Sequence, residues 1–381
     1  MTENTLIEQA VLPTFSDKQA HVGMPPLART RRAIAFFEFW PTPLVYFPVA
    51  MLWLFRAIQH RSLTLPLCAN PGFYLGGMVG ESKATNFSCA GEYARQHIAD
   101  WCRVQNDLSQ ADKTLNTALE TMTASGLHFP LIAKPDMGCR GQGVRIVRDA
   151  VEVADYLQDF PDGGHILFQQ LVPYEAEAGI FYIRMPGADR GQLFSITLKY
   201  QPYVYGNGID TLRTLIQQDR RAGQLTHLYF KRHEAVLDQV IPEGQPFRLA
   251  FAGSHSRGAI FRDGRHLITE ALTTAFDRIC QDIDGFYYGR FDVRFRDTQS
   301  LQEGQDFTIL EINGVSSEAA HIWDADSSLR EVYKTLFHQY NTLFRIGAIN
   351  RRKGARPDGL LALIKGWQEE KRLGRHYPDT E

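Results

Sequence analysis

The sequence predicts an α+β (α/β) fold, and two features of its pattern carry that prediction. Between residues 130 and 201, short apolar runs are separated by turns that contain glycine and proline, as is typical of strands. Segments such as 151–160 and 268–283 repeat apolar residues at helical spacing. At roughly 150 residues per domain, a chain of 381 residues suggests two or three domains.

The expected elements follow one another mostly in a strand–loop–helix order. We expect a loosely tied arm at 1–28, mostly helical structure with loops at 91–124, and a peripheral tail at 351–381. We expect strands at 63–70, 130–136, 144–149, 165–172, 179–186, 193–201, 286–296 and 306–313. We expect helices at 151–160, 209–223, 268–283 and 328–344, the second of them ending at a C-cap glycine.

Composition and charge exclude several classes of protein. Hydrophobic residues make up 44% and charged residues 22%, which excludes a disordered chain, a collagen and a coiled coil. The formal charge of −2 argues against a nucleic-acid coat, and no nucleic-acid partner is expected. The five cysteines form no C-x-x-C pair, so we expect no zinc site or disulfide framework and a cytoplasmic location. Residues 1–20 carry acids and no apolar run, so we expect no signal peptide.

An apolar segment at 33–55 is flanked by arginines on both sides. Residues 44–55 are apolar apart from Pro48, but the run is shorter than the span of about 20 apolar residues that crosses a membrane. Two interpretations stay open. One is a buried helix or helical hairpin in a large core. The other is a peripheral patch at the inner face of a membrane, with Trp40 and Trp53 at the interface.

A lysine and a glycine loop form the first candidate site. Lys134 ends a buried apolar strand, and the loop DMGCRGQG (136–143) follows with three glycines that free the backbone to bend. Backbone N–H groups in such a loop can bind phosphate, and the lysine adds a positive charge. A glycine hairpin with a surface lysine is the alternative, because no P-loop ending of the type G-K-[ST] is present.

Two later strands carry a candidate metal site. In GRFDVR, Arg290, Asp292 and Arg294 share one face because side chains alternate along a strand. In LEIN, Glu311 and Asn313 also share a face. If the strands pair, two carboxylates and an amide oxygen converge, and these are ligands suited to Mg²⁺. A structural ladder of salt bridges is the alternative.

The order of the motifs resembles the ATP-grasp superfamily. IAKPDMGCRGQGV, FQQLVPYEAE, GRFDVR and ILEIN succeed one another as in the D-alanine–D-alanine ligase branch and in the ligase domains of cyanophycin synthetase and of fused glutathione synthetases. The GDG turn of those synthetases is similar to GNGIDTLRTLI at 206–216. The resemblance covers about residues 65–345 and implies two α+β lobes that grip ATP with two Mg²⁺ ions, with Mn²⁺ as an alternative ion.

The resemblance also divides the chain. The expected parts are an arm with an apolar, membrane-associated or buried helical segment at 1–62, a region before the ATP-grasp fold at 63–125, a small lobe at 126–195, a large lobe with the magnesium site at 196–345, and a tail at 346–381.

By resemblance, individual residues receive roles. The ATP phosphates would contact Lys83, Lys134, Gly138, Arg140, Gly141 and Gly143. Adenine would contact Gln170, Leu171 and Val172, the ribose would contact Glu177 or its rival Glu175, and Mg²⁺ would bind Asp292, Glu311 and Asn313. Lys199 would reach the γ-phosphate, and Arg290 would stabilise the oxyanion of the tetrahedral intermediate. Gln170 stands where a Glu is common, Asn207 replaces the Asp of the GDG turn, and motifs for binding D-alanine are not visible.

The implied activity is an ADP-forming carboxylate–amine ligase that acts through an acyl phosphate on a small-molecule acid and amine. The alternative is an ATP-grasp phosphotransferase, or a membrane-recruited nucleotide-binding protein without ligase activity. Two further segments remain open. GSHSRGAIF (253–261) places Arg257 either on a substrate carboxylate or phosphate or in a plain turn. GVSSEAAHIWD (314–324) either binds the acceptor through Ser316, Ser317, Glu318 and His321 or caps the next helix.

Overall fold

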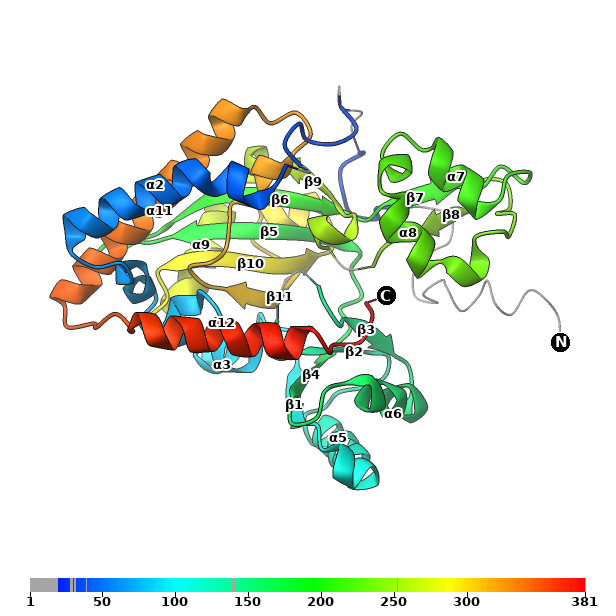
Figure 1. Cartoon of the computed structure of the whole chain (residues 1–381), viewed down its shortest axis with the longest axis horizontal. Helices are drawn as coiled ribbons and strands as arrows, with labels where there is room; N and C mark the ends of the chain where they lie inside the picture. The colour runs from blue at the N-terminus through cyan, green and yellow to red at the C-terminus, as the bar shows by residue number, and fades with distance from the viewer. Residues whose placement is uncertain are drawn as a thin grey trace.

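A computed structural model of the chain describes residues 20–27, 30, 32–38, 40–138, 141–251 and 253–380. Its strands form a four-stranded sheet in the order β1-β4-β2-β3, a five-stranded sheet in the order β11-β10-β5-β6-β9, and a two-stranded ribbon, β7-β8. Every pairing within these sheets is antiparallel. The three sheets occupy different parts of the molecule, with the five-stranded sheet at its centre (Figure 1). The expected α+β fold is confirmed.

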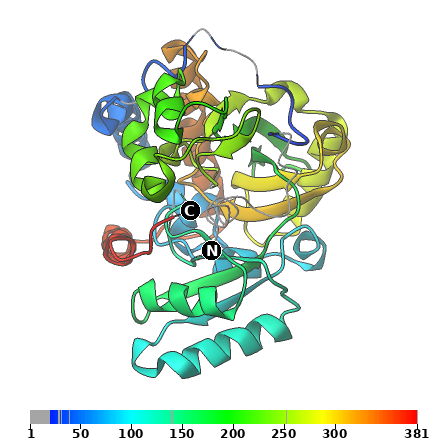
Figure 2. The ribbon, with the colours of Figure 1, turned by 90° about the vertical axis from the view of Figure 1, so that its right-hand side faces the viewer.

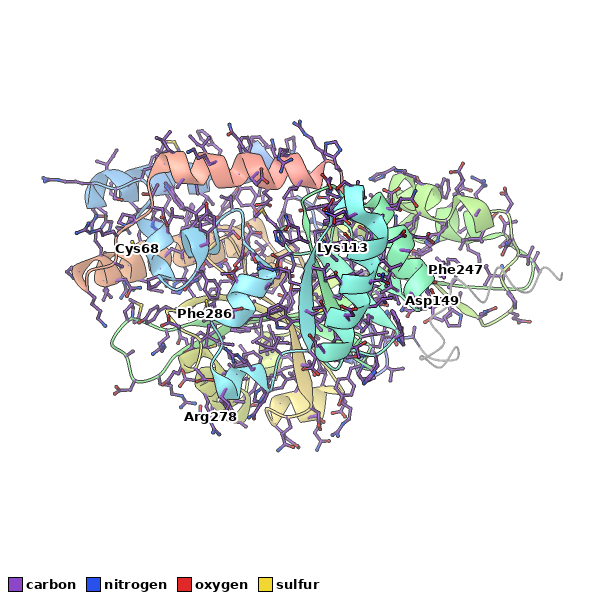
Figure 3. All side chains as sticks on the ribbon, turned by 90° about the horizontal axis from the view of Figure 1, so that it is seen from below. Cys68, Lys113, Asp149, Phe247, Arg278 and Phe286 are labelled. Carbon is purple, nitrogen blue, oxygen red and sulfur yellow. The ribbon has the colours of Figure 1, made fainter. Side chains whose placement is uncertain are left out.

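The four-stranded sheet has two helices packed on one of its faces (Figure 2). Lys113 on the first helix and Asp149, which caps the second, lie together on this outer layer (Figure 3). The Asp149 carboxylate accepts hydrogen bonds from the backbone N–H groups of Val151 and Glu152, and so fixes where that helix begins. The elements are β1 (Trp101–Gln105), α5 (Ala111–Ala124), β2 (Leu131–Pro135), β3 (Arg145–Val147), α6 (Ala150–Asp159) and β4 (His165–Gln170).

The five-stranded sheet has a core on each face, because side chains alternate along its strands. On the middle strand, Ile180 and Tyr182 pack toward α9, whereas Phe181 and Ile183 pack toward α11. Phe286, just before β10, belongs to the core on the α9 side and lies inside the larger body (Figure 3). The elements are β5 (Ala176–Ile183), β6 (Gln192–Tyr200), β9 (Ile260–Asp263), α9 (Glu270–Gln281), β10 (Tyr288–Phe295), β11 (Phe307–Asn313) and α11 (Leu329–Arg352).

The remaining elements connect or cover these two sheets. The ribbon β7–β8 and its two helices form a separate small core that includes Phe247 (Figure 3). These elements are α2 (Thr42–His60), α3 (Lys83–Ser88), α4 (Glu92–Arg95), β7 (Tyr203–Tyr205), α7 (Leu212–Gln218), α8 (Thr226–Arg232), β8 (Pro246–Arg248), α10 (Thr298–Gln302) and α12 (Leu360–Gly374). Within the described ranges, none of the helices combines the length and the apolar character needed to cross a membrane.

Several sequence predictions were wrong. Residues 63–70 are not a strand: Leu65–Ala69 form a 3₁₀ turn that packs under α11, where Asn350 Nδ2 donates to the Cys68 carbonyl at 2.9 Å. Strand β1 was missed inside 91–124, and the helix expected at 209–223 stops at Gln218. The segment 351–381 is not a peripheral tail, because it contains α12 and a stretch that binds the glycine loop. Most of the expected arm, residues 1–19 and 28, lies outside the described residues.

Asn70 is a fully buried residue that holds the start of β10, the strand that carries Arg290 and Asp292. Its Oδ1 accepts from the N–H groups of Tyr287 and Tyr288, and its Nδ2 donates to the Tyr288 carbonyl at 2.7 Å. The side chain therefore supplies hydrogen bonds to backbone groups that have no water within reach.

We expect Asn70→Ala to lower the free energy of unfolding by about 1–3 kcal/mol, since it leaves buried backbone groups unpaired. Urea denaturation measures this change. Asn116→Ala, at an exposed position on α5, is the matched control and should stay within about 0.5 kcal/mol of the wild type. Equal losses in the two variants would contradict the role given to Asn70.

Candidate functional site

A cavity of about 870 Å³ lies between the two larger sheets, and residues of both sheets line it. The four-stranded sheet contributes Ile132, Lys134, Pro135, Gln169 and Gln170, and the five-stranded sheet contributes Glu177, Lys199, Arg290, Asp292, Arg294, Leu310, Glu311, Ile312 and Asn313. The cavity therefore joins the glycine-loop site and the metal-site strands, which the sequence analysis treated as separate candidates.

Strands β10 and β11 pair as expected, and their polar residues meet. In the register, Asp292 lies opposite Glu311 and Arg290 lies opposite Asn313. A register shift after Asp292 marks a bulge in the pairing. On the other side of β10, Gly179 of β5 lies opposite Asp292, and a Cβ at that glycine would come within 3.0 Å of Arg290 Cδ. A larger residue there would press on the Arg290 side chain, which lies across this glycine.

Buried ion pairs connect three neighbouring strands beside this register. Lys199 Nζ lies 2.9 Å from Glu177 Oε1 and 3.0 Å from Asp292 Oδ1, and Arg290 Nε lies 2.9 Å from the same Asp292 oxygen. Burial opposes ionisation of Asp292, but Arg290 and Lys199 outweigh it and lower the pKa of Asp292 to about 2. Burial lowers the pKa of Lys199, but Asp292 and Glu177 outweigh burial and raise it. Asp292 and Lys199 are therefore charged in the folded protein at neutral pH.

Two lysines face these carboxylates. Lys134 Nζ donates to Gln169 Oε1 at 2.7 Å and to the Leu310 carbonyl at 3.1 Å. Lys83 Nζ donates to the Gly138 carbonyl at 2.7 Å and lies 3.4 Å from Glu311 Oε1. Burial lowers the pKa of the Lys134 ammonium from 10.5 to about 8, although Glu311 raises it in part. The Lys134 ammonium is therefore charged at neutral pH but loses its proton at about pH 8.

Asp136, two residues after Lys134, ties the segment of Lys83 to the glycine loop. Its carboxylate accepts from Ser82 Oγ and from the Ala84 N–H, each at 2.8 Å, and its carbonyl accepts from the Lys83 N–H. Because the two lysines are fixed to the same short stretch, they enter the cavity together.

The hinge between the two sheets runs from β4 to β5. Leu171 and Val172 line the cavity, and the Val172 carbonyl accepts from Arg294 at 3.1 Å. The side chain of Gln170 is held by the backbone of His128. Glu177 lines the cavity, whereas Glu175 does not: it accepts from Tyr203 Oη at 2.6 Å. The structure thus brings Glu177 rather than Glu175 to the cavity.

Other residues singled out from the sequence lie elsewhere. Gly143 and Arg257 are not among the lining residues, and Arg140 lies outside the described residues. Gly143, at φ +69°, has a Cβ position 2.9 Å from Pro135, and its N–H donates to Thr380 Oγ1. His321 is buried, with its Nδ1 2.6 Å from Ser195 Oγ, so it does not face the acceptor region. Gly143, Arg257 and His321 therefore do not line the cavity, because long-range packing sets the orientation of strands and loops.

The chain end clasps the glycine loop. Tyr377 Oη donates to the Met137 carbonyl at 2.6 Å, and Thr380 Oγ1 donates to the Gly141 carbonyl at 2.9 Å. Glu370 of α12 accepts from the Gly80 N–H at 2.8 Å and lines the cavity. Gly138 and Gly141 line the cavity as expected, held in place by a segment that the sequence analysis left as a tail.

The cavity contains further acidic and aromatic residues, of which Glu38, Glu81 and Glu370 received no role in the sequence analysis. At one end, Glu318 accepts from Tyr46 Oη and, at 3.4 Å, from Trp323 Nε1, and Trp40 lines the same end. Glu38, which lies within the segment 33–55 but received no role there, is 2.8 Å from Arg221. Burial opposes its ionisation, yet hydrogen bonds and charge from His255 and Arg221 lower the pKa of Glu38 to about 2. Glu81 lies two residues before Lys83, which had already been singled out in GESK, so its place in the sequence offered a usable signal.

The donor set fits a magnesium–nucleotide better than a metal held by protein alone. Within the described residues, no three His, Cys, Asp or Glu side chains gather closely enough to hold a metal ion. The lining nevertheless includes six Asp and Glu side chains besides Glu81, whose carboxyl has a pKa of about 8, against five Lys and Arg. This surplus would repel a polyphosphate unless a cation accompanied it. Asp292, Glu311 and Asn313 offer the oxygen atoms that Mg²⁺ prefers, and phosphate oxygens and water would complete the shell.

Glu81 gives a test of the buried charges. Burial raises the pKa of the Glu81 carboxyl from 4.5 to about 8, and its Oε1 accepts from Asn86 Nδ2 and the Gly314 N–H. An unfolded chain ionises this group above about pH 4.5, whereas the folded protein keeps the proton to about pH 8. The contribution of Glu81 to the free energy of unfolding therefore falls as the pH rises through that window.

We expect Glu81→Gln to remove this fall, because the amide cannot ionise. Urea denaturation at about pH 5 and about pH 8 should show that the variant loses less stability than the wild type between the two conditions. Glu120→Gln, exposed on α5, should retain the wild-type pH dependence. Identical pH profiles for wild type and Glu81→Gln would refute the assignment.

Comparisons with known proteins add the following. No protein-family model matches the chain, and no curated protein matches it in sequence. Among solved structures, it is similar to a D-alanine–D-alanine ligase from Bacillus anthracis, with 13% identity, a TM-score of 0.38, and 72% of this chain and 69% of that chain covered. It is also similar to the ligase of the same name from Coxiella burnetii, at 9% identity and a TM-score of 0.36, covering 76% and 61% of the two chains.

A bifunctional glutathione synthetase from Pasteurella multocida is similar at 14% identity and a TM-score of 0.35, and the match covers 68% of this chain but only 36% of that chain. These proteins are ATP-grasp ligases, the superfamily that the motifs resemble. All three TM-scores lie below 0.5, so the likeness to these structures does not support a function for this chain. The residues of the cavity have to carry that argument.

Proposed function

We propose that the chain is an ATP-dependent, ADP-forming carboxylate–amine ligase that works through an acyl phosphate. One observation carries the proposal. A single cavity holds Lys83, Lys134 and the glycine loop on one side and the paired Asp292–Glu311 and Arg290–Asn313 on the other. Such a ligation needs cations that bind phosphate, oxygen ligands for a divalent ion, and an arginine that stabilises an oxyanion.

The nucleotide would lie along the seam between the sheets. The hinge backbone at Leu171 and Val172 would meet the adenine, and Glu177 would accept the ribose hydroxyls. Lys83, Lys134 and the backbone of Gly138 and Gly141 would bind the phosphates. Lys199 is already bound by two carboxylates, so its charge would act mainly on a γ-phosphate that approaches Asp292.

Asp292, Glu311 and Asn313 would hold Mg²⁺ together with the phosphates. Bound there, Mg²⁺ neutralises charge on the β- and γ-phosphate oxygens. Lys83 lies beside Glu311, and Lys199 and Arg290 pair with Asp292.

The reaction would then proceed in two steps. A substrate carboxylate oxygen attacks the γ-phosphorus of ATP, the bond to the β–γ bridging oxygen breaks, and ADP and an acyl phosphate form. An amine attacks the acyl carbon, loses a proton, and expels phosphate to leave an amide. Arg290, whose guanidinium is fixed by Asp292 and the Glu318 carbonyl, would stabilise the oxyanion of the second step.

The far end of the cavity suits an amine that carries an apolar group. Glu318 is held by Tyr46 and Trp323, and Trp40 and Val45 line the same end. A carboxylate among aromatic rings attracts an ammonium group through charge and cation–π contacts. We therefore assign Glu318 to the incoming amine and the aromatic wall to its substituent.

Lys134 provides the test of nucleotide binding. Lys134→Ala should weaken Mg·ATP binding by about 1–3 kcal/mol, the range for a charged hydrogen-bond partner. Since burial lowers the pKa of Lys134 to about 8, the affinity of the wild type should also fall as the pH rises through that value. Calorimetry from about pH 7 to about pH 9 measures both effects.

Lys134→Arg is the matched control for this titration, because arginine stays charged throughout the range. Its affinity should depend less on pH than that of the wild type. Equal affinities of wild type and Lys134→Ala for Mg·ATP would make the phosphate assignment wrong.

Asp292 and Arg290 provide the test of the chemistry. Asp292→Asn keeps the volume but removes a charge, and it should lower turnover about 10²-fold or more, the scale for losing an electrostatic partner of the transition state. Arg290→Ala should lower turnover while changing ATP affinity less than Lys134→Ala does. The measurement is ADP release in the presence of an acid and an amine, as a function of Mg²⁺, with circular dichroism as the folding control.

A folded Asp292→Asn variant with wild-type turnover and Mg²⁺ dependence would falsify the metal assignment. Screening pairs of acids and apolar amines, with mass detection of the product, separates the two candidate activities. ADP release that requires both substrates and yields an amide supports the ligase. Phosphate retained on an acceptor would instead assign a phosphotransferase.

A further inference from the structure

The outer face of α2 is an unbroken stripe of exposed apolar side chains. Six large residues lie on it: Leu44, Phe47, Met51, Leu54, Phe55 and Ile58, each exposed by 49–78%. Their spacing keeps all six within about a third of the helix circumference at 3.6 residues per turn. The opposite face packs against α11 through Val45, Val49 and Ala57. A stripe of this size on a helix surface marks a contact with something other than water.

A second helix presents apolar residues on the same side of the molecule. On α12, Leu360, Leu361, Ile364 and Trp367 are exposed by 40–76%. Both helices form the outermost layer on one face, nearest the viewer in Figure 1 and at the left edge in Figure 2. The cavity lies between them, since Thr42, Val45 and Tyr46 of α2 and Glu370 of α12 line it.

The charges around these helices are mostly positive. Helix α2 contains no Asp or Glu. Exposed basic residues follow it and flank α12: Arg61, Arg351, Arg352, Lys353, Arg356, Lys365, Lys371, Arg372 and Arg375. The same stretches contain only Asp358, Glu369 and Glu370 as acids, and Glu369 is paired with Arg372. Lys371 Nζ lies 4.1 Å from the centre of the Trp367 ring, so a cation and an aromatic ring stand side by side.

We infer that α2 and α12 together form a docking surface for an anionic membrane, into which both helices insert their apolar faces while the basic residues bind lipid phosphates. Amphipathic helices bind membranes in this way without crossing them, through buried apolar area plus attraction to anionic lipid. A protein partner would need acidic residues to match the basic rim and a groove shaped to fit two separate helices. An anionic lipid surface supplies the negative charge and can receive both helices without a matching shape. The inference does not depend on the ligase activity.

The test uses the full chain and vesicles of phosphatidylcholine with or without phosphatidylglycerol. The wild type should co-sediment with the anionic vesicles, less with the neutral ones, and less as salt is added. Phe47→Ser/Phe55→Ser/Ile58→Ser should weaken binding about tenfold or more, as expected from the apolar area lost. Val151→Ser/Tyr205→Ser/Ile209→Ser removes three residues of similar exposure elsewhere and should bind like the wild type.

Charge reversal separates the two contributions. Lys365→Glu/Lys371→Glu should weaken binding to anionic vesicles and leave binding to neutral ones nearly unchanged. Circular dichroism and thermal unfolding check folding, and the single variants Phe47→Ser and Ile58→Ser keep the test valid if the triple variant unfolds.

Three results would overturn the inference. The first is a wild type that binds neither kind of vesicle. The second is a folded serine variant that binds vesicles as tightly as the wild type. The third is a self-associating wild type, seen by sedimentation equilibrium, that the serine substitutions dissociate while vesicles fail to bind; the stripe would then be an interface between copies of the chain.

Discussion

The cavity depends on the buried ion pairs that the Lys199 ammonium makes with Glu177 and Asp292. Neighbouring strands β5, β6 and β10 contribute these three charges: Glu177 lies opposite Lys199, and Asp292 lies opposite Gly179, two residues further along β5. Arg290 extends the set. A buried charge without a partner costs several kcal/mol, so none of these residues can be lost without exposing the others to that cost. The network therefore fixes the strands' relative positions and concentrates opposite charges where a phosphate and a metal ion would meet.

The second constraint is the distance along the chain between the parts of the cavity. The glycine loop is held by Tyr377 and Thr380, more than two hundred residues later, and its lysine partner Lys83 comes from fifty residues before. Loops that cradle phosphate need backbone groups in fixed directions, and glycine by itself provides freedom rather than direction. Here the direction comes from the C-terminal segment, so the loop and the chain end form one unit.

The sequence predicted the parts of the site that depend on local periodicity. Alternation along β10 and β11 was enough to put Arg290, Asp292, Glu311 and Asn313 on one side, since a strand has a period of two. Alternation could not decide between Glu175 and Glu177, because it places both on one face. The hydrogen bond from Tyr203 to Glu175 distinguishes them in the structure. Leu65–Ala69 was mistaken for a strand because a short apolar run has the same composition whether or not it pairs with another strand. The C-terminal clasp gave no local signal at all.

The two faces of helix α2 explain why the sequence of the segment 33–55 left two interpretations open. Its buried face completes the core with α11, as Trp53 does against Phe344 at a ring distance of 5.3 Å, and Tyr46 extends that face into the wall of the cavity. Its outer face is as apolar as its inner one, which is why the segment 33–55 reads as continuous rather than amphipathic. A helix that only filled a core would gain nothing from Phe47, Phe55 or Ile58, because side chains exposed by 61–78% contribute almost no burial. One face of α2 is therefore buried against α11, as the core interpretation expected, whereas the other face is exposed and is not explained by packing within this chain.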